Sequence, residues 1–571
     1  MQAFMDALNV VNGVIWHDAV LYVVLGVGVL FTLWSGFSQY RALTHGTQVI
    51  RGVYDDPDDP GAINHFQALS AALSATVGLG NIGGVAVAIA LGGPGAVFWM
   101  WMIGVAGMAL KTTEVTLSMI HRNTDDPRNP HGGPMYVADR GFAAMGVPAV
   151  GKAVGGIFCV TLLVSTLTGG NMFQAWNVAE VTHAYFGVPQ IASGILLAVL
   201  VGAVILGGIE RIGSVAGRLV PAMCAVYLLA SFYVLGANLG DIPHAFGLIL
   251  KGAFSPLEAE GAFMGGTAGY AFLWGMKRAL FSSEAGQGSS PIAHSAARTK
   301  EPVREAVVAG LEPFIDTIVV CTLTALVILS SGVWNRGPDL VFESSPQVVS
   351  RDGGFSLETG PIRPPEGEVW ADGDTVFAVL GGVVSDVTES RVRLPGVLRP
   401  AGGGAFDVEW DDFTGGALNG RPTLVVDGAF LAYPGATLTA KAFDATTEGL
   451  GKWLISLAAW LFAVSTIISW NYYGEQGIIY LFGERFVLAY RIVYCGLIVL
   501  ATIPWLIRTD AELDTFTSLG TGVMLWANIP IMLVFGGQAM SAYHRYITHL
   551  KAGKFVRHPP AEVVDVVEGR G

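Results

Sequence analysis

The sequence predicts an all-α polytopic membrane protein of eleven spans, interrupted by one mostly β extramembrane insertion. Of its 571 residues 52% are hydrophobic and 13% charged, whereas soluble proteins carry about 25% charged residues. Eleven apolar runs are long enough to cross a hydrocarbon core, which takes about 20 residues for each helix. Between residues 334 and 450 these runs give way to short alternating segments bounded by Gly and Pro, which is typical of β-strands.

The expected spans lie near 18–36, 66–91, 94–119, 152–177, 189–208, 214–237, 262–281, 306–333, 451–471, 488–507 and 514–538. They divide the chain into an N-terminal helix with its linker (1–60), a first core block (61–333), the insertion (334–450), a second core block (451–540) and a tail (541–571). We therefore expect lipid to surround most of the chain.

The positions of the basic residues predict the orientation in the membrane. Short cytoplasmic loops retain Lys and Arg, and 20 of the 32 basic residues fall in 37–65, 120–152, 209–218, 277–305, 484–491 and 543–571. With an odd number of spans, the N-terminus is expected outside and the C-terminus inside. The first ten residues lack the basic start of a secretory signal, and we expect a multi-pass protein of the plasma (inner) membrane.

The insertion at 334–450 is acidic, with 17 Asp and Glu against 8 Lys and Arg, a net charge of −9 out of −13 for the chain. The number of spans before and after it predicts that the insertion lies on the outer side of the membrane. Two interpretations of its charge are open, a solvated surface or the recruitment of cations to the mouth of a pore. Its function and any protein partner are unassigned, and nucleic acid is not an expected partner.

One apolar span carries an unusual interruption, because the run SAALSATVGLGNIGG at 70–84 places four glycines and an asparagine inside 66–91. In lipid, irregular backbone is tolerated only where it lines a cavity or binds a ligand. Freed amides in Val77–Asn81 would bind a carboxylate, and freed carbonyls would bind a dehydrated sodium ion. The alternative is that these glycines only allow helices to pack closely.

A second interruption is predicted in 262–281, where MGGTAGYAFLWG mixes glycines and a threonine into an apolar run. Paired broken spans at corresponding positions of two repeats indicate a central transport site. Counted from the second span, the two interruptions fall in core spans 1 and 6. This spacing predicts an inverted repeat of five plus five spans after one extra N-terminal helix.

Several blocks resemble the alanine or glycine:cation symporter family, also called sodium:alanine symporters, within the amino acid–polyamine–cation superfamily. They are SATVGLGNIGGVAVAIALGGPGAVFWMWMIGVAGMALKTTEV, HGGPMYV, GGNMFQ, MKRALFSSEAGQGSSPIAHSAA, FIDTIVVCTLTALVIL and FAVSTIISWNYYGEQGIIYLFG. The resemblance implies a leucine-transporter-type fold and sodium-coupled uptake of small neutral amino acids, alanine or glycine above all. The β insertion has no counterpart in this resemblance.

The same resemblance implies roles for individual residues. Gly78 and Gly80, with the backbone of Val77 and the neighbouring Asn81, would bind the carboxylate and amino ends of the substrate. Polar contacts and a pocket wall would come from Gln174, Thr466 and Trp470. Sodium would bind to Ser74 and Val77 on one helix and to Ser465 or Thr466 on another.

Each assignment on the second helix has an alternative. Thr466 and Trp470 are four residues apart and therefore face the same way on a helix. The hydroxyls of Ser465 and Thr466 would otherwise bond to their own helix, and Trp470 would otherwise anchor the helix at the headgroup level.

Ionisable residues in or near spans are candidates for function. Lys111 and Glu114, three apart in one span, are expected to share a face and neutralise each other. Asp316 is expected to act in a gate or to pair with Lys277 or Arg278, and Glu284 to form a cytoplasmic gate or helix cap.

Three classes of function are weighed against one another. An enzyme would need a His, Cys or paired-carboxylate constellation at one membrane depth, and the sequence offers none, so we expect no enzyme. A sensor or scaffold built on a transporter body, and a symporter coupled to another cation, are the alternatives to a sodium-coupled symporter.

Overall fold

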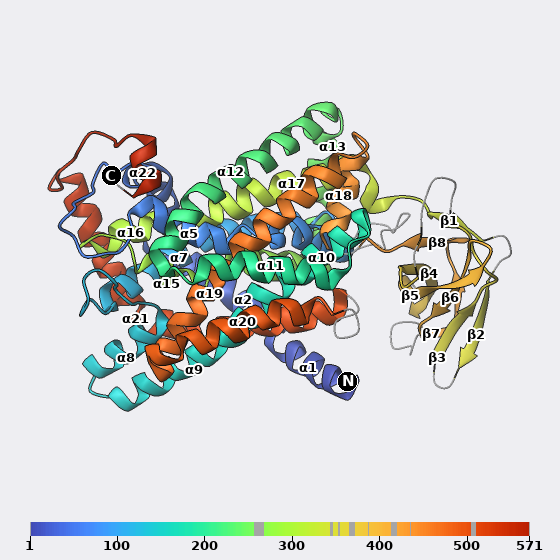
Figure 1. The fold of residues 1–571 in the computed structure, drawn as a ribbon, viewed down its shortest axis with the longest axis horizontal. Coiled ribbons are helices and arrows are strands. Elements are labelled where there is room, and N and C mark those ends of the chain that lie inside the picture. Colours follow the sequence, from blue (N-terminus) through green and yellow to red (C-terminus); the bar gives the residue numbers. More distant parts are fainter. Residues whose placement is uncertain are drawn as a thin grey trace.

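The computed structural model describes residues 2–255, 268–342, 346–351, 354–364, 370, 372–385, 388–412, 419–433, 435–503 and 510–569. Helices form an elongated body, and the strands gather in a separate lobe at one end of it (Figure 1). The C-terminus lies at the opposite end of the body (Figure 1). The strand lobe and the C-terminal tail are therefore separated by the length of the helical body.

The first part of the body is built from helices and π-helical turns, the latter labelled η. They are α1 (Gln2–Ile15), α2 (Asp18–Trp34), α3 (Ser38–Arg41), η1 (Ala42–Gly46), α4 (Thr47–Val49), α5 (His65–Thr76), η2 (Gly80–Gly84), α6 (Val85–Gly92), α7 (Ala96–His121), α8 (Pro134–Ala144), α9 (Pro148–Leu167), η3 (Thr168–Met172), α10 (Phe173–Phe186), α11 (Gln190–Ile205), α12 (Gly208–Ala237) and α13 (Ile242–Phe254).

The remaining helical elements complete the body on both sides of the strands. They are α14 (Ala268–Ser283), α15 (Ser290–His294), α16 (Pro302–Ala309), η4 (Phe314–Cys321), α17 (Thr322–Ser331), the 3₁₀ turn η5 (Val333–Asn335), α18 (Ala436–Asp444), η6 (Gly451–Ile455), α19 (Ser456–Phe482), the 3₁₀ turn η7 (Glu484–Phe486), α20 (Val487–Ala501), α21 (Asp510–Lys551) and α22 (Val563–Glu568).

Within the described ranges, six helical stretches are long and apolar enough to cross a membrane, or up to eight spans if each of two bent helix pairs counts as one. The bent pairs are α2 with Ser38–Val49, at 67°, and α5 with Gly80–Gly92, at 52°. The expected spans near 189–208, 262–281 and 488–507 contain the shorter helices α11, α14 and α20.

The first broken helix begins and ends for local reasons. Asn64 precedes α5, and its side chain accepts a hydrogen bond from the Gln67 amide at 2.8 Å, the usual way to satisfy a free helix N-terminus. The helix ends at Thr76 because Val77 has a ψ of 84°, which no helical residue adopts. The chain then continues through the π-helical turn η2 into α6.

The second predicted interruption, MGGTAGYAFLWG at 264–275, is helical in the part that the structure describes. Residues 264–267 lie outside the described residues, and Ala268–Ser283 forms one continuous helix, α14. A Cβ built on Gly275 would lie 2.3 Å from the Ala96 carbonyl oxygen, so this glycine allows α14 to pack closely on α7. The break follows at Glu284–Ser289, before the short helix α15.

The strand lobe consists of β1 (Leu340–Val341), β2 (Gln347–Arg351), β3 (Gly354–Glu358), β4 (Thr375–Ser385), β5 (Thr388–Gly402), β6 (Ala405–Trp410), β7 (Asn419–Leu424) and β8 (Gly428–Leu431). The sheet has the order β1-β8-β4-β5-β6 with β7 paired to β4, and β2 and β3 form a separate hairpin. Its pairs are antiparallel, for example Leu380 opposite Val392. A core that includes Val376, Leu394 and Trp410 is buried within the lobe itself.

A polar cluster ties the two ends of the lobe together. Asp339 forms an ion pair with Arg336 at 3.0 Å and accepts a hydrogen bond from the Leu431 amide at 2.7 Å. The Arg336 guanidinium lies 3.9 Å from the centre of the Tyr433 ring. Helix α18 follows directly, and its Thr439 hydroxyl donates to the Ile82 carbonyl in η2 at 2.9 Å. The predicted outer range 334–450 thus includes a helix that contacts the first broken helix.

We predict that the strand lobe can be removed without unfolding the helical body. Val341 pairs with Gly428, so a short Gly/Ser turn in place of 342–427 would join β1 directly to β8 and leave the Asp339 cluster intact. The shortened protein should elute as one monodisperse species and keep its thermal unfolding midpoint within a few degrees, because the lobe has its own core. Aggregation of this variant while the full chain stays monodisperse would contradict the prediction.

Candidate functional site

The backbone amides released by the first broken helix are bound by side chains. The Gly78 amide donates to the Asn81 side-chain oxygen at 2.8 Å, and the Leu79 amide donates to the Gln174 side-chain oxygen at 3.1 Å. Asn81 lies in η2, whereas Gln174 comes from α10. These two oxygens occupy the positions that a carboxylate would take on such amides.

A small cavity lies against this backbone, with a volume of about 10 Å³. This is room for about one water molecule, so the walls must move apart before an amino acid can enter. Five residues singled out in the sequence line the cavity, namely Gly78, Gly80, Gln174, Glu284 and Trp470. The others are Ala75, Thr76, Gly169, Phe281 and Ser282.

Thr466 faces the same glycine from α19. A Cβ built on Gly78 would lie 2.5 Å from the Thr466 hydroxyl oxygen. This hydroxyl is buried and has no hydrogen-bond partner in the part of the chain that the structure describes. The expected alternative, a bond from Thr466 back to its own helix, is therefore not what this structure contains. A buried polar group without a partner is costly, which makes Thr466 a natural contact for a ligand.

Trp470 lies one helical turn further along α19 and packs against the interior. It is buried, and a Cβ built on Gly170 would lie 2.3 Å from its ring. The centres of the Trp470 and Tyr473 rings lie 5.4 Å apart, in an edge-to-face arrangement. An aromatic anchor at the lipid headgroups would be exposed, so the structure favours the pocket-wall interpretation of Trp470.

The proposed sodium ligands lie where α5 and α19 meet. The Ser74 hydroxyl donates to the Ser465 carbonyl at 2.7 Å, and the Ser465 hydroxyl lies 3.4 Å from the Ser74 carbonyl oxygen. Ser465 also donates to its own helix at Phe462, at 2.9 Å. Hydroxyl and carbonyl oxygens of both helices therefore converge in a buried place, a donor set that suits a hard cation. Among the described residues no group of three or more His, Cys, Asp or Glu has the arrangement of a metal site.

Asn81 and Val77 have other surroundings than the cavity. The Asn81 side-chain nitrogen donates to the Asp316 carboxylate, which also accepts from Ser282 at 2.7 Å and Thr317 at 2.7 Å. The Asn81 side chain thus connects the Gly78 amide, through its oxygen, to Asp316 of η4, through its nitrogen. Val77 is buried and supplies the backbone at which α5 ends.

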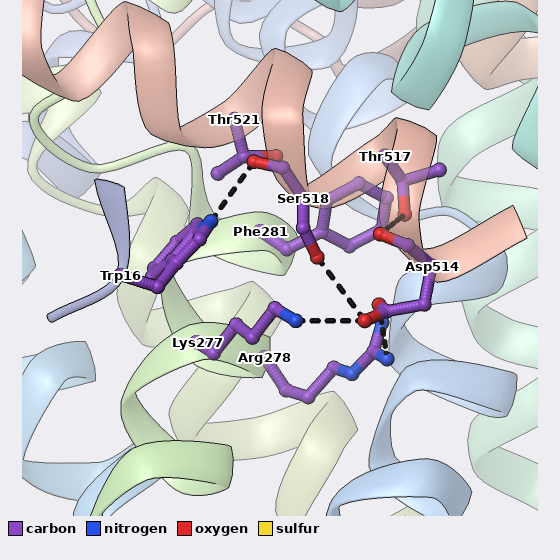
Figure 2. Close-up of a pocket in the computed structure, with 8 residues that line it drawn as sticks. All are labelled: Trp16, Lys277, Arg278, Phe281, Asp514, Thr517, Ser518 and Thr521. Carbon is purple, nitrogen blue, oxygen red and sulfur yellow. Dashed lines mark hydrogen bonds and ion pairs between the residues drawn. The ribbon is translucent and has the colours of Figure 1, made fainter. Parts of the chain in front are cut away.

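The expected pairing of Asp316 with Lys277 or Arg278 is wrong. Both cations bind Asp514 at the start of α21, at 2.7 Å and 2.5 Å (Figure 2). Ser518 donates to the same carboxylate at 3.2 Å. The indole N–H of Trp16, the residue that follows α1, donates to the Ser518 carbonyl at 3.0 Å. Asp316, on η4, accepts hydrogen bonds from the neutral donors Asn81, Ser282 and Thr317 instead.

The second break is also held by a side chain from another helix. Both oxygens of Glu114, on α7, accept hydrogen bonds from the backbone amides of Gly286 and Gly288, at 2.5 Å and 3.0 Å. Both glycines have a positive φ, of 83° and 80°, which side chains other than glycine rarely tolerate. The expected pair between Lys111 and Glu114 is therefore not formed, and Lys111 lies 3.3 Å from Glu312 instead.

A buried ionic network continues from this loop, and sequence reasoning missed most of it. His294 bonds to Glu312 at 2.7 Å and to Glu305 at 2.5 Å, and His65 bonds to Glu305 from the start of α5. All these side chains are buried. The available signal was the presence of ionisable residues within apolar helices, such as Glu305 and Glu312, seven positions apart.

With this geometry established, comparison with known proteins identifies the class and then the family. Two interrupted membrane helices around a small buried cavity define a transporter rather than an enzyme. The sequence profile of the sodium:alanine symporter family matches residues 1–351 and 424–558, and the chain belongs to this family. It is therefore a multi-pass membrane protein of amino acid transport by symport. The unmatched residues 352–423 fall in the strand lobe.

Individual relatives support the same placement. The chain is 34% identical to the sodium/alanine symporter AgcS of Methanococcus maripaludis, and the matched region covers 86% of this chain and 86% of AgcS. It is 29% identical over 96% of its length to the putative sodium/proton-dependent alanine carrier protein YrbD of Bacillus subtilis, covering 93% of that protein. The probable sodium/glutamine symporter GlnT of Bacillus subtilis is 33% identical over 59% of this chain and 68% of its own length.

A solved structure, that of a manganese transporter mutant from Eremococcus coleocola, aligns with 90% of this chain and 96% of its own. Its TM-score is 0.44 at 11% identity, so no argument rests on it.

We predict that Gly78→Ala abolishes alanine binding. The added Cβ would overlap the Thr466 hydroxyl, and such overpacking typically costs about 1–3 kcal/mol. Gly236→Ala is the matched control, because a Cβ there meets nothing within 4 Å. Scintillation-proximity binding of labelled alanine would decide, and full affinity in a monodisperse Gly78→Ala variant would move the site elsewhere.

We also predict that Trp470→Ala widens the range of accepted substrates. Removing the indole from a buried wall enlarges the cavity on the side of Gly170. Leucine and methionine should then compete with labelled alanine more strongly than they do in the unmodified protein. An unchanged competition profile in a folded, active variant would show that Trp470 does not limit the substrate's side chain.

Proposed function

We propose that this protein takes up small neutral amino acids, alanine or glycine foremost, by sodium-coupled symport with alternating access. The observation that carries the proposal is the unpartnered Thr466 hydroxyl facing Gly78 at the break of a membrane helix. A substrate carboxylate would replace the side-chain oxygens of Asn81 and Gln174 on the Gly78 and Leu79 amides. Substrate contacts would come from Val77, Gly78, Gly80, Asn81, Gln174, Thr466 and Trp470.

Sodium is the cation that we propose as the coupled cargo. Its ligands would be carbonyl oxygens of Ser74 and Val77 and the hydroxyls of Ser465 and Thr466. Sodium bound there would hold α5 against α19, beside the substrate site, so that each ligand would favour the binding of the other. The names of two relatives support the choice of sodium and alanine, and the name of a third includes glutamine. Coupling to another cation is the alternative.

The membrane arrangement that we propose has eleven spans, five plus five in inverted repeat after one N-terminal helix, with the N-terminus outside. Residues 61–333 and 451–540 would form the core, and the lobe within 334–450 would lie outside the cell. In this orientation Asp514, at the start of α21, belongs to the outer half. Lys277 and Arg278, which the count of basic residues assigned to a cytoplasmic segment, would then lie in the outer half with Asp514. Their ion pairs with Asp514 would close the outer entrance above Phe281, which lines both this polar cluster and the cavity.

The decisive experiment is uptake of labelled alanine into proteoliposomes that contain the purified protein. We expect an inward sodium gradient to drive accumulation. Replacement of sodium by choline should abolish uptake, and a proton gradient alone should not restore it, because the sodium ligands are neutral oxygens. Robust proton-driven uptake without sodium would contradict the proposal. Sodium-independent binding without any transport would favour the sensor or scaffold alternative, which the strand lobe keeps open.

We predict further that Ser465→Ala raises the sodium concentration needed for half-maximal uptake several-fold. The change removes one hydroxyl near the Ser74 carbonyl but leaves the backbone oxygens in place. Ser231→Ala is the control, since Ser231 is a buried serine whose hydroxyl donates to the Tyr227 carbonyl of its own helix, α12. Equal sodium dependence of both variants would remove Ser465 from the ion site.

A further inference from the structure

Glu284 is a buried acid that the roles assigned above do not use. It is the first residue after α14, its side chain is 1% exposed, and it lines the cavity together with Gly78, Gln174 and Trp470. Its backbone lies in the left-handed region, with a φ of 53°. Among the described non-glycine residues only Phe37 shares this property. A conformation that is unfavourable for such a side chain persists only where the surroundings impose it, and often at functional sites.

The hydrogen bonding of Glu284 is incomplete. One carboxylate oxygen, Oε2, accepts from the Ser289 hydroxyl, whereas Oε1 is buried and has no partner in the described part of the chain. The Tyr473 hydroxyl is likewise buried without a hydrogen-bond partner in the described part of the chain. The geometry therefore places an unsatisfied carboxylate oxygen beside the substrate cavity.

The charged and titratable groups that face Glu284 are Lys111 on α7, Glu312 just before η4, Asp316 within η4 and Tyr473 on α19. Lys111 is the cation of this set, and it lies 3.3 Å from Glu312, which His294 also contacts at 2.7 Å. Glu114, nearby, is satisfied by two backbone amides. Glu284 is thus left without a cation of its own in the described structure.

A carboxylate buried without a partner is expensive, and it becomes neutral by taking up a proton. The positive charge of the Lys111 ammonium disfavours a metal cation beside Glu284. A proton instead neutralises the carboxylate and brings no separate ion next to Lys111. A proton on Oε1 would also give this oxygen a hydrogen to donate. The excess of carboxylates over cations, the strained backbone of Glu284 and its unpartnered oxygen all favour a proton as the ligand.

We propose that Glu284 is a proton-binding site of the substrate cavity, protonated while the cavity is closed and ionised when the Glu284–Ser289 loop opens to water. The proton moves between bulk water and Oε1, and no other bond changes. This inference rests on the proposed alternating-access function. It adds a proton as a third ligand, which links transport to pH without replacing sodium as the driving ion.

The test is calorimetry of alanine binding to the full chain at saturating sodium, in two buffers of different ionisation enthalpy. Binding that closes the cavity should take up a proton, so the measured enthalpy should differ between the buffers. The apparent Kd should rise with pH by up to tenfold per unit, the limit for one proton. Equal enthalpies in both buffers and a constant Kd between about pH 6 and 9 would overturn the inference.

Variants assign the proton to Glu284. E284Q should bind alanine with no buffer dependence and no pH dependence, whereas E180Q should behave as the unmodified protein. Glu180 is a suitable control because it is bonded to Gln190 at 2.7 Å and does not line the cavity. An E284Q variant with the full proton uptake would overturn the assignment.

A second variant covers the case in which E284Q does not fold. S289A removes the hydroxyl that donates to Oε2 of Glu284, which stabilises the ionised form. The pH at which alanine affinity falls should therefore move upward, and an unchanged midpoint would overturn the inference. The two proposals fail separately: absence of sodium-dependent alanine binding defeats the proposed function, whereas sodium-dependent binding without proton uptake defeats this inference alone.

Discussion

The backbone groups released by two broken helices are the constraint on which the rest of the site depends. In a membrane interior such groups must find partners within the protein, and here side chains supply them. Asn81 and Gln174 bind the amides of the first break, and Glu114 binds those of the second. These side chains connect the broken helices to α7, α10 and η4. A conformational change at either break therefore also displaces one of these neighbouring elements or breaks its hydrogen bond.

This arrangement explains why the cavity is both closed and ready to bind. The side-chain oxygens of Asn81 and Gln174 resemble a carboxylate in chemistry, and a substrate would exchange with them at little cost in hydrogen bonds. The cavity of about 10 Å³ requires that its walls separate first. Phe281 and Trp470 are the large side chains of that wall, and Phe281 comes from the helix that carries the Lys277 and Arg278 ion pairs with Asp514.

The sequence predicted the membrane class, the family and the first broken helix, because hydropathy and a cluster of glycines are local signals. Within the described part of the second predicted interruption, Gly275 lies in a continuous helix and allows close packing on α7, whereas Gly286 and Gly288, further along the chain, have the positive φ of an interrupted helix. The ion pairs of Lys111 and Asp514 were not predictable from spacing, since partners such as Glu312 and Lys277 are far apart in the chain. Burial, which decides that Trp470 lies in the interior, likewise depends on tertiary packing.

The proposed function requires that the amides of the first break bind the substrate's carboxylate. This can be seen in a structure determined with L-alanine and sodium bound. We expect the carboxylate within hydrogen-bond distance of the amides of Gly78–Gly80, the side chains of Asn81 or Gln174 displaced from them, and a ligand contact at the Thr466 hydroxyl. Alanine bound elsewhere, with the hydrogen bonds from Gly78 to Asn81 and from Leu79 to Gln174 unchanged, would contradict it.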